Sequence, residues 1–369
     1  MSEQTVPVGP VGPTGSIVFI TVNQSFTMHP GITELHFIVN QLGNEGAKSL
    51  ANKLKYNNTL TTLNLTHNEI GKEGAKSLAD ALKYNNTLTT LKLIGNKIGD
   101  EGTQSLADTL KYNNTLTTLE LLGNEIGVEG VKSLADVLQH ASNKISDKAT
   151  DLQASAGDSK HNVALTSLGI KYNRIGAEGA KSLADALKDN NTLTELDLEN
   201  NEIGDEGAKS FGDVLQHNST LRELDLSDNR IGDGGAKSLG DALQHNSTLT
   251  TLNLTYNEIG DEGVKSLGDA LKHNSTLTTL NLWSNEIGAE GKDILLKIQA
   301  DRSSSRTRDL EKIWIILHEY QRDDKESTDT IGEFPALLES RCPFKWLPLE
   351  MIHKIIRHMN IAKPLQIKL

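Results

Sequence analysis

The sequence predicts an α/β solenoid, in which a curved inner parallel β-sheet is covered on its outer side by helices. The first observation is a unit of 28 residues that returns almost unchanged along the chain and is marked by one asparagine. The second is that every unit holds a short alternating apolar segment followed by an apolar helical face. A solenoid grows by stacking units on one continuous core, so 369 residues do not require several separate domains. The marker asparagines are Asn40, Asn68, Asn96, Asn124, Asn173, Asn201, Asn229, Asn257 and Asn285.

Each of the nine units follows the pattern L-x-x-L-x-L-x-x-N-x-I-G. Leu63 and Leu65 alternate on a predicted strand and point into the core, whereas Asn64 points to the opposite face. Asn68 is predicted to turn inward, where its amide satisfies backbone groups at the bend. The following glycines permit the turn into a helix. The apolar face of that helix is Ala75, Leu78, Ala79 and Leu82.

The two ends and one insertion interrupt this regularity. Residues 1–30 are predicted to be a flexible tail and cap, with an apolar strand or hairpin in 16–30 that covers the first unit. Residues 31–300 hold the nine units. An insertion at 141–161 is predicted either as a tolerated surface insertion or as a protruding contact element that prolongs the preceding helix. Residues 301–369 are predicted to be a small helical segment.

That C-terminal segment contains a helical apolar pattern over "LEKIWIILHEYQ", formed by Leu310, Ile313, Trp314 and Leu317. Its last part, "LPLEMIHKIIRHMNI", is similar to the opening helix of an F-box, a module that docks a substrate receptor to a ubiquitin ligase. A structural cap with a proline at its helix start is the other interpretation. The residues that carry the resemblance are Leu347, Pro348, Glu350, Ile352, Ile355 and Ile356.

The repeated stretch "LTTLNLTHNEIGKEGAKSLADALKYN" resembles the ribonuclease-inhibitor class of leucine-rich repeats. This resemblance implies a curved horseshoe that binds a partner protein and holds no cofactor. It also raises a GTPase activator of the Ran regulator type as an alternative. That family has a strongly acidic tail, whereas residues 301–369 carry 12 basic and 11 acidic residues. A second alternative is a ubiquitin-ligase substrate receptor that a bacterium delivers into a host cell as an effector.

The charge of the chain limits its partners. Asp and Glu number 49 against 37 Lys and Arg, which gives a net charge of −12. Nucleic acids and anionic membranes repel such a chain, so neither is predicted as a partner. One cysteine, no basic signal region and no apolar segment of membrane-spanning length favour a cytoplasmic protein. We also expect a monomer.

Functional information is expected where the units differ, at the strand positions that face solvent. Carboxylates gather there on adjacent predicted strands, and like charges on neighbouring strands oppose folding. We therefore expect a basic partner, with neutral drift on a solvated face as the alternative. Ile94 and Leu122 are predicted to form an exposed apolar pair beside these carboxylates, and Tyr256 and Trp283 to be aromatic contacts. The predicted acidic patch is Glu195, Asp197, Glu199, Glu223 and Asp225.

The sequence predicts no catalytic, metal or cofactor site. It contains no P-loop, no H-E-x-x-H, no G-x-S-x-G and no C-x-x-C motif. Paired carboxylates on an open sheet lack the water-excluding pocket that catalysis needs. The sequence therefore predicts a non-enzymatic protein-interaction scaffold whose partner binds on the concave face.

Overall fold

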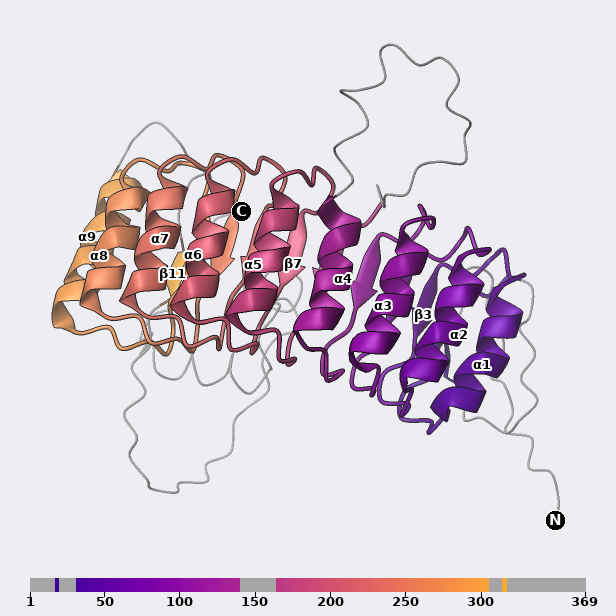
Figure 1. Ribbon diagram of the computed structural model, residues 1–369. Coiled ribbons are helices and arrows are strands. Elements are labelled where there is room, and N and C mark those ends of the chain that lie inside the picture. The colour runs from indigo at the N-terminus through magenta and orange to yellow at the C-terminus, as the bar shows by residue number, and fades with distance from the viewer. Residues whose placement is uncertain (1–16, 20–30, 140–163, 305–313, 317–369) are drawn as a thin grey trace, which may run out of the picture. The chain divides into compact units, whose positions relative to one another are not determined.

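A computed structural model describes residues 17–19, 31–139, 164–304 and 314–316 (Figure 1). The chain divides into two units, Met1–Leu317 and His318–Leu369. All described residues belong to the first unit, and the insertion at 141–161 lies outside them.

The described strands form one sheet of eleven parallel strands in chain order, each three residues long. Parallel strands need a crossover, and here each crossover between β2 and β10 holds one helix wherever the structure describes it. The strands are β1 (Ile17–Phe19), β2 (Glu34–His36), β3 (Thr62–Asn64), β4 (Thr90–Lys92), β5 (Thr118–Glu120), β6 (Ser167–Gly169), β7 (Glu195–Asp197), β8 (Glu223–Asp225), β9 (Thr251–Asn253), β10 (Thr279–Asn281) and β11 (Trp314–Ile316).

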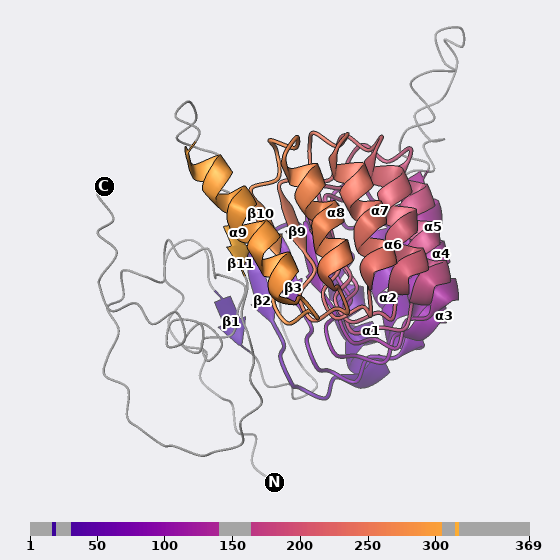
Figure 2. The same ribbon diagram turned by 90° about the vertical axis from the view of Figure 1, so that its left-hand side faces the viewer.

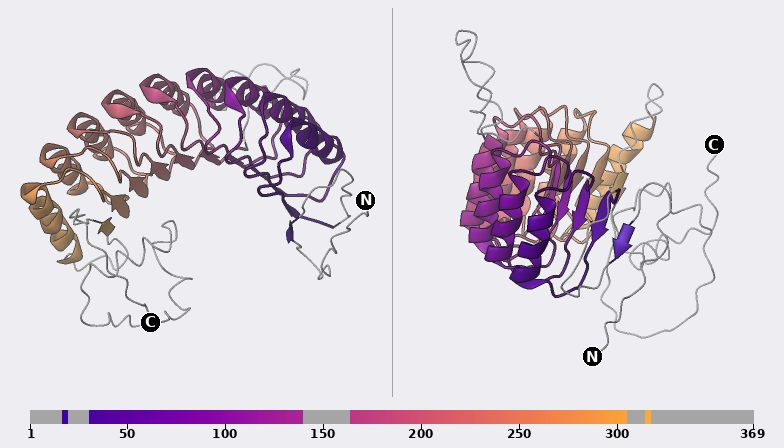
Figure 3. Two further views of the ribbon diagram at one scale, coloured as in Figure 1. Left: turned by 90° about the horizontal axis from the view of Figure 1, so that it is seen from below. Right: turned by 90° about the vertical axis from the view of Figure 1, so that its right-hand side faces the viewer.

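The described helices all lie on one side of this sheet, and the repeat array curves with the helices outside and the strands inside (Figure 3). Figure 2 shows the two layers from one end of the array. The predicted α/β solenoid is therefore confirmed. The helices are α1 (Gly43–Leu54), α2 (Lys72–Leu82), α3 (Gly99–Leu110), α4 (Val128–Gln139), α5 (Gly176–Leu187), α6 (Gly204–Leu215), α7 (Asp233–Leu243), α8 (Asp261–Leu271) and α9 (Ala289–Ser304).

The core is a single apolar layer between sheet and helices. In β3 the central Leu63 is fully buried, whereas Thr62 and Asn64 on either side of it are half-buried. Leu78 and Leu82 on α2 face the same layer, because residues four apart lie on one side of a helix. This pattern repeats in every described unit, so each unit covers the apolar surface of its neighbour.

The marker asparagines turn inward and satisfy backbone groups, as predicted, and their hydrogen bonds also join neighbouring units. Asn96 donates from Nδ2 to the backbone oxygens of Leu65 at 3.0 Å and Leu93 at 2.8 Å. Its Oδ1 accepts from the backbone N–H groups of Asn68 at 3.0 Å and Ile70 at 2.9 Å. A buried side chain that satisfies four backbone groups is strongly constrained, because an apolar residue would leave them unpaired.

A second asparagine ladder, which the sequence analysis did not identify, follows the helices. Asn85 donates from Nδ2 to the backbone oxygens of Leu54 and Asn57, each at 2.9 Å, and its Oδ1 accepts from the N–H of Leu88 at 2.9 Å. The equivalent asparagines Asn113, Asn190, Asn218, Asn246 and Asn274 are also buried. The Asn-Ser-Thr sequences at 218–220 and 246–248 therefore begin with structural asparagines.

The turn into each helix takes one of two forms, and the residue at the start of the preceding helix selects between them. Asp233 Oδ1 accepts from the N–H groups of Gly260 and Gly263, both at 2.8 Å, and Gly260 is then extended with φ −97°. Asn44, Asp100, Asp205 and Asp261 cap the following turn in the same way. An oxygen acceptor from one unit thus caps the helix of the next.

The other form occurs where the capping oxygen is missing. Lys72, Val128 and Ala177 occupy the capping position before α3, α5 and α6. The glycines of those turns, Gly99, Gly176 and Gly204, have φ near +60° (+60°, +60° and +62°), and the helix begins one residue earlier. Only glycine adopts this backbone without a steric cost.

The ends of the array require one correction. The helix predicted around Leu310, Ile313, Trp314 and Leu317 is wrong at Trp314–Ile316, which forms β11 and pairs in parallel with β10. Without β11, β10 would be an edge strand with unpaired backbone groups, and aromatic and β-branched residues suit the strand that covers it. At the other end, Ile17–Phe19 pairs with β2.

Replacing Asp233 by alanine should lower the free energy of unfolding by about 1–2 kcal/mol, because two N–H groups at the start of α8 lose their acceptor. Asp233→Asn should retain most of the stability, since Asn44 makes the same two bonds. Urea denaturation followed by circular dichroism measures both changes.

Val128→Ala is the matched control, because Val128 occupies the same position without capping the next turn. Its cost should stay below about 0.5 kcal/mol. An equal loss for Asp233→Ala and Val128→Ala would contradict the role of the cap.

Candidate protein-binding face

The concave face is built from the first and third residues of each strand. Both flank a central leucine that points into the core, so they point to the opposite face of the sheet. The strands pair in register, and equivalent residues of successive units therefore lie side by side in rows. The two rows vary from unit to unit, in contrast to the leucines between them.

Four carboxylates form a two-by-two array on β7 and β8, which we call the carboxylate array. Glu195 lies opposite Glu223, and Asp197 lies opposite Asp225. Adjacent strands are about 4.8 Å apart, so each carboxylate has a like charge beside it. The structure thus brings together four of the five residues of the predicted acidic patch, and Glu199 follows β7 in the next loop.

Lys171 neutralises part of this patch, which the sequence analysis did not foresee. Its ammonium lies 2.6 Å from Asp197 and 3.6 Å from Glu199. Burial alone would lower the pKa of Lys171, but the attraction of Asp197 and the other carboxylates raises it overall. Lys171 is therefore charged at neutral pH, and Asp197 and Glu199 already have a cationic partner.

Tyr172 binds the same patch from the neighbouring position. Its hydroxyl donates to Glu199 Oε1 at 2.9 Å. Burial and this bond raise the pKa of Tyr172 to about 12, so the hydroxyl remains a donor. Lys171 and Tyr172 together hold Glu199 against the sheet.

Asp225 is held by neutral donors. Its Oδ1 accepts from the N–H of Ser227 at 2.9 Å and from the Ser227 hydroxyl, and Oδ2 accepts from Asn253 Nδ2 at 2.8 Å. Burial first, and then the charge of Asp197, raise the pKa of Asp225 to about 6. The ionised carboxylate of Asp225 is therefore less stable in the folded protein than in the unfolded chain.

Glu195 and Glu223 are the uncompensated members of the carboxylate array. Both are exposed, and among the described residues neither forms an ion pair or a side-chain hydrogen bond. Partial loss of water around its carboxyl and then the charge of Glu195 raise the pKa of Glu223. A cation from a partner protein would therefore be attracted most strongly to Glu195 and Glu223.

The apolar residues predicted beside the acidic patch are less accessible than expected. Ile94 and Leu122 are half-buried, whereas we predicted an exposed pair. Tyr256 is 43 % exposed and meets Trp283 edge to face at a ring distance of 4.6 Å. The Trp283 ring is half-buried, and its Nε1 finds no hydrogen-bond partner among the described residues.

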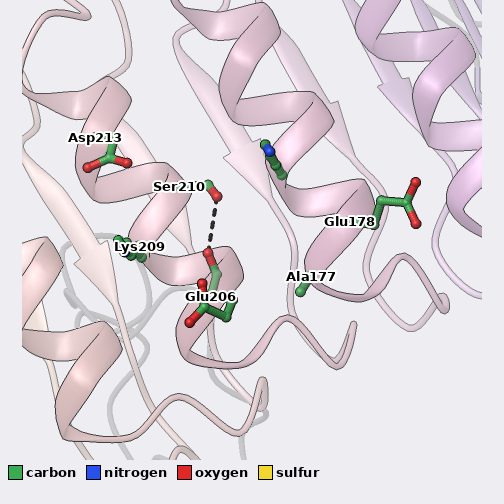
Figure 4. A pocket seen from close by; sticks show the side chains of 7 residues that line it. Ala177, Glu178, Glu206, Lys209, Ser210 and Asp213 are labelled. Carbon is green, nitrogen blue, oxygen red and sulfur yellow. Dashed lines mark hydrogen bonds between the residues drawn. The ribbon is translucent and has the colours of Figure 1, made fainter.

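The helical side of the array is a less suitable surface for binding a partner protein. A groove of about 400 Å³ runs between α5 and α6, lined by Glu178, Lys181, Glu206 and Lys209 among others (Figure 4). Ser210 in this groove donates to the backbone oxygen of Glu206 at 3.0 Å. Mixed exposed charges on helices of almost identical sequence are typical of a solvated face.

Some predicted features lie outside the described residues. They include the F-box-like positions Leu347, Pro348, Glu350, Ile352, Ile355 and Ile356. Within the part that the structure describes, no helix has the length and apolar character needed to cross a membrane. No cluster of three or more His, Cys, Asp or Glu in those same ranges is arranged to hold a metal ion.

Comparison with known proteins supports the assignment of the repeated units. The family model described as "Leucine Rich repeat" matches eight segments, which together cover half of the chain: residues 56–79, 84–107, 112–135, 161–184, 189–212, 217–240, 245–268 and 273–291. No curated protein matches the chain. Among solved structures, the leiomodin-1 actin-binding site 2 aligns with a TM-score of 0.34 and 16% identity, over 62% of this chain and 95% of that one.

Asp225→Asn should stabilise the protein at pH 7 by about 1–2 kcal/mol and leave it unchanged near pH 4. The folded pKa of about 6 lies above the ordinary 3.8, so the folded state retains a proton that the unfolded chain releases. Wild-type stability therefore falls as the pH rises from about 4 to about 6, and the amide removes this fall. Asn64 accepts the equivalent bond from the N–H of Thr66 at 3.1 Å, so the fold accommodates asparagine here.

Urea denaturation at several pH values tests this expectation, with Asp80→Asn on the helical side as the control. Asp80 is exposed and, among the described residues, pairs only with Lys83 three residues along α2, so the loss of its charge should cost less than about 0.5 kcal/mol. A loss of stability on Asp225→Asn that is the same at pH 4 and pH 7 would contradict the cause given for the raised pKa.

Proposed function

Because the chain belongs to the leucine-rich repeat family, whose repeats make it a protein-interaction module, we propose that a partner protein binds on its concave face. The observation that carries the proposal is the distribution of variation between units. Core leucines and both asparagine ladders repeat almost without change, whereas the outward strand residues run through threonine, lysine, glutamate, aspartate and asparagine.

The variable rows occupy the strands, which form a continuous inner face that one partner can span. Residues of nine units reach this face, so affinity can be distributed over many contacts. The helical surface repeats the same "EGAKSLADAL"-like sequence and offers little to distinguish one partner from another.

The partner that this face fits best is basic. Glu195 and Glu223 lie side by side and exposed, with no cationic partner in the part of the chain that the structure describes, and the whole chain carries a net charge of −12. A positive patch on the partner would relieve their mutual repulsion and would be steered toward the face at low ionic strength. Asp197, Glu199 and Asp225 add to the negative electrostatic potential of this face, but each already has a hydrogen-bond or ion-pair partner within the protein.

In this proposal the protein binds its partner without catalysing a reaction. The carboxylates lie on an open sheet, whereas catalytic carboxylates work in pockets that exclude water. Ile94, Leu122, Tyr256 and Trp283 then supply the apolar contacts that resist dissociation.

A photo-crosslinking amino acid at Thr251 on the concave face should capture a partner from cell extract, whereas the same group at Lys76 on α2 should not. Mass spectrometry identifies the captured protein. Capture from Lys76 alone would contradict the proposed binding face.

With that partner purified, replacing Glu195 and Glu223 together by glutamine should slow association by about tenfold at low salt and flatten its salt dependence. Folding should be intact, because both side chains are exposed. The controls are charge reversals at Lys76, Asp80 and Lys181 on the helical side, which should change the association rate by less than about twofold. An association rate that responds to the helical reversals and not to the glutamines would refute the assignment.

A further inference from the structure

Three exposed tyrosines occupy the same position in successive units, directly after α1, α2 and α3. Tyr56, Tyr84 and Tyr112 are 79 %, 64 % and 57 % exposed, and we call them the tyrosine row. Aromatic side chains that are exposed in a row, rather than singly, mark an interaction surface. In the later described units the same position holds a polar residue: Asp189, His217, His245 and His273.

The backbone holds the three tyrosines in equivalent places. The N–H of each tyrosine bonds to a backbone oxygen in the last turn of its own helix, at 2.9–3.3 Å. The next residue in each unit is an asparagine that joins the units, since Asn85 donates to the oxygen of Asn57 at 2.9 Å and Asn113 to that of Asn85 at 3.1 Å. Neighbouring packed helices lie about 8–10 Å apart, so helix packing sets the interval between the tyrosines.

Lys55 gives an upper limit for the distance between the first two rings. Its ammonium lies 5.5 Å from the centre of the Tyr56 ring and 4.0 Å from the centre of the Tyr84 ring. The two ring centres are therefore at most about 9.5 Å apart. Tyr112 follows Tyr84 across the next pair of packed helices, α2 and α3.

A polyproline II helix repeats over nearly the same distance. It has three residues per turn and rises about 3.1 Å per residue, so every third residue lies on one side at intervals of about 9.3 Å. A proline at every third position would therefore bring one proline ring to each tyrosine. Aromatic surfaces bind such segments well, because a polyproline II helix is largely formed before it binds.

The chain itself contains a segment with this spacing. In "VPVGPVGPT" a proline recurs at every third position, as Pro7, Pro10 and Pro13. No other three prolines of the sequence have this spacing. The three prolines match the three tyrosines in number and in interval.

Strand β1 brings this segment within reach of the tyrosine row. Ile17 begins β1, which pairs in parallel with β2, and β2 pairs in parallel with β3. The chain therefore enters β1 at the same edge of the sheet as it enters β3, and Tyr56 lies at the start of the connection into β3. Two strand spacings are about 10 Å, whereas the four residues from Pro13 to Ile17 span up to about 13 Å.

We propose that the tyrosine row binds a polyproline II segment and that residues 7–13 of the same chain occupy it. The pairs are Pro13 with Tyr56, Pro10 with Tyr84 and Pro7 with Tyr112. This inference goes beyond the proposed function, because the tyrosine row lies where the helices end and not on the concave strands. A segment bound across three units ties them together at the first end of the array.

Nitration of the full chain, with each tyrosine quantified by mass spectrometry, tests the occupant. Replacing Pro7, Pro10 and Pro13 together by alanine should raise the nitration rate of the tyrosine row by about threefold or more, because proline rings no longer cover the tyrosines. Tyr256, which is 43 % exposed on the concave side, is the internal reference. The matched control is Val8→Ala with Val11→Ala, which changes the same segment and keeps its prolines.

A fluorescent peptide with the sequence "VPVGPVGPT" tests the site separately. By anisotropy it should bind the triple proline variant about tenfold more tightly than the wild type, where the tethered segment already fills the site at high effective concentration. Adding Tyr84→Ser to the triple variant should weaken the peptide about tenfold. His245→Ser is the matched control, since His245 occupies the same position outside the tyrosine row. Circular dichroism verifies that every variant is folded.

Each contrary outcome identifies the part that is wrong. Equal nitration of the tyrosine row in the wild type and the triple proline variant would overturn residues 7–13 as the occupant. Shielding that disappears when the wild type is diluted would show that the segment comes from a second copy, which also overturns the proposal. Peptide binding that ignores Tyr84→Ser would overturn the tyrosine row as a site for polyproline II segments.

Discussion

The hydrogen bonds between an asparagine side chain and the backbone of the neighbouring unit are the interaction on which this fold depends. Asn96 holds four backbone groups at the end of the strand, and Asn85 does the same after the helix. Both turns are buried, and water cannot satisfy their N–H and C=O groups. A unit that lost either asparagine would leave buried backbone groups unpaired at its contact with the next unit, so the two ladders help to hold the strands in register.

This constraint decides where the protein can carry information. Core leucines and ladder asparagines point inward, and replacing them destabilises the fold. Replacing a residue that caps the next turn removes the acceptor for two N–H groups of that turn; these residues are Asn44, Asp100, Asp205, Asp233 and Asp261. The outward strand positions are not constrained by the core or by the turns. In-register stacking then turns a difference between two units into neighbouring side chains on one surface, which is why carboxylates from separate units act as a group.

Binding and stability oppose each other on that surface. Like charges at Glu195 and Glu223 and the raised pKa of Asp225 destabilise the folded state at neutral pH. Lys171 pairs with Asp197 of the carboxylate array and with Glu199 in the loop after β7, and not with Glu195 or Glu223. A partner cation that replaced the missing counter-charge would gain affinity from repulsion already present in the free protein, as expected of a site poised for a ligand.

The sequence by itself determined the solenoid, its unit length and the face on which each residue lies, because these follow from periodicities of 2 and 3.6 residues within one unit. Leu63 and Asn68 could therefore be placed correctly. Tertiary structure alone decided how residues of different units meet: the pairing of Lys171 with Asp197 and the half-burial of Leu122. It also overrode local periodicity at Trp314–Ile316, where an edge strand needed a partner for its backbone. The physical reason is range. A periodic pattern specifies the direction in which a side chain leaves the backbone, whereas contact between units depends on distances between groups that lie 26 to 52 residues apart in the sequence.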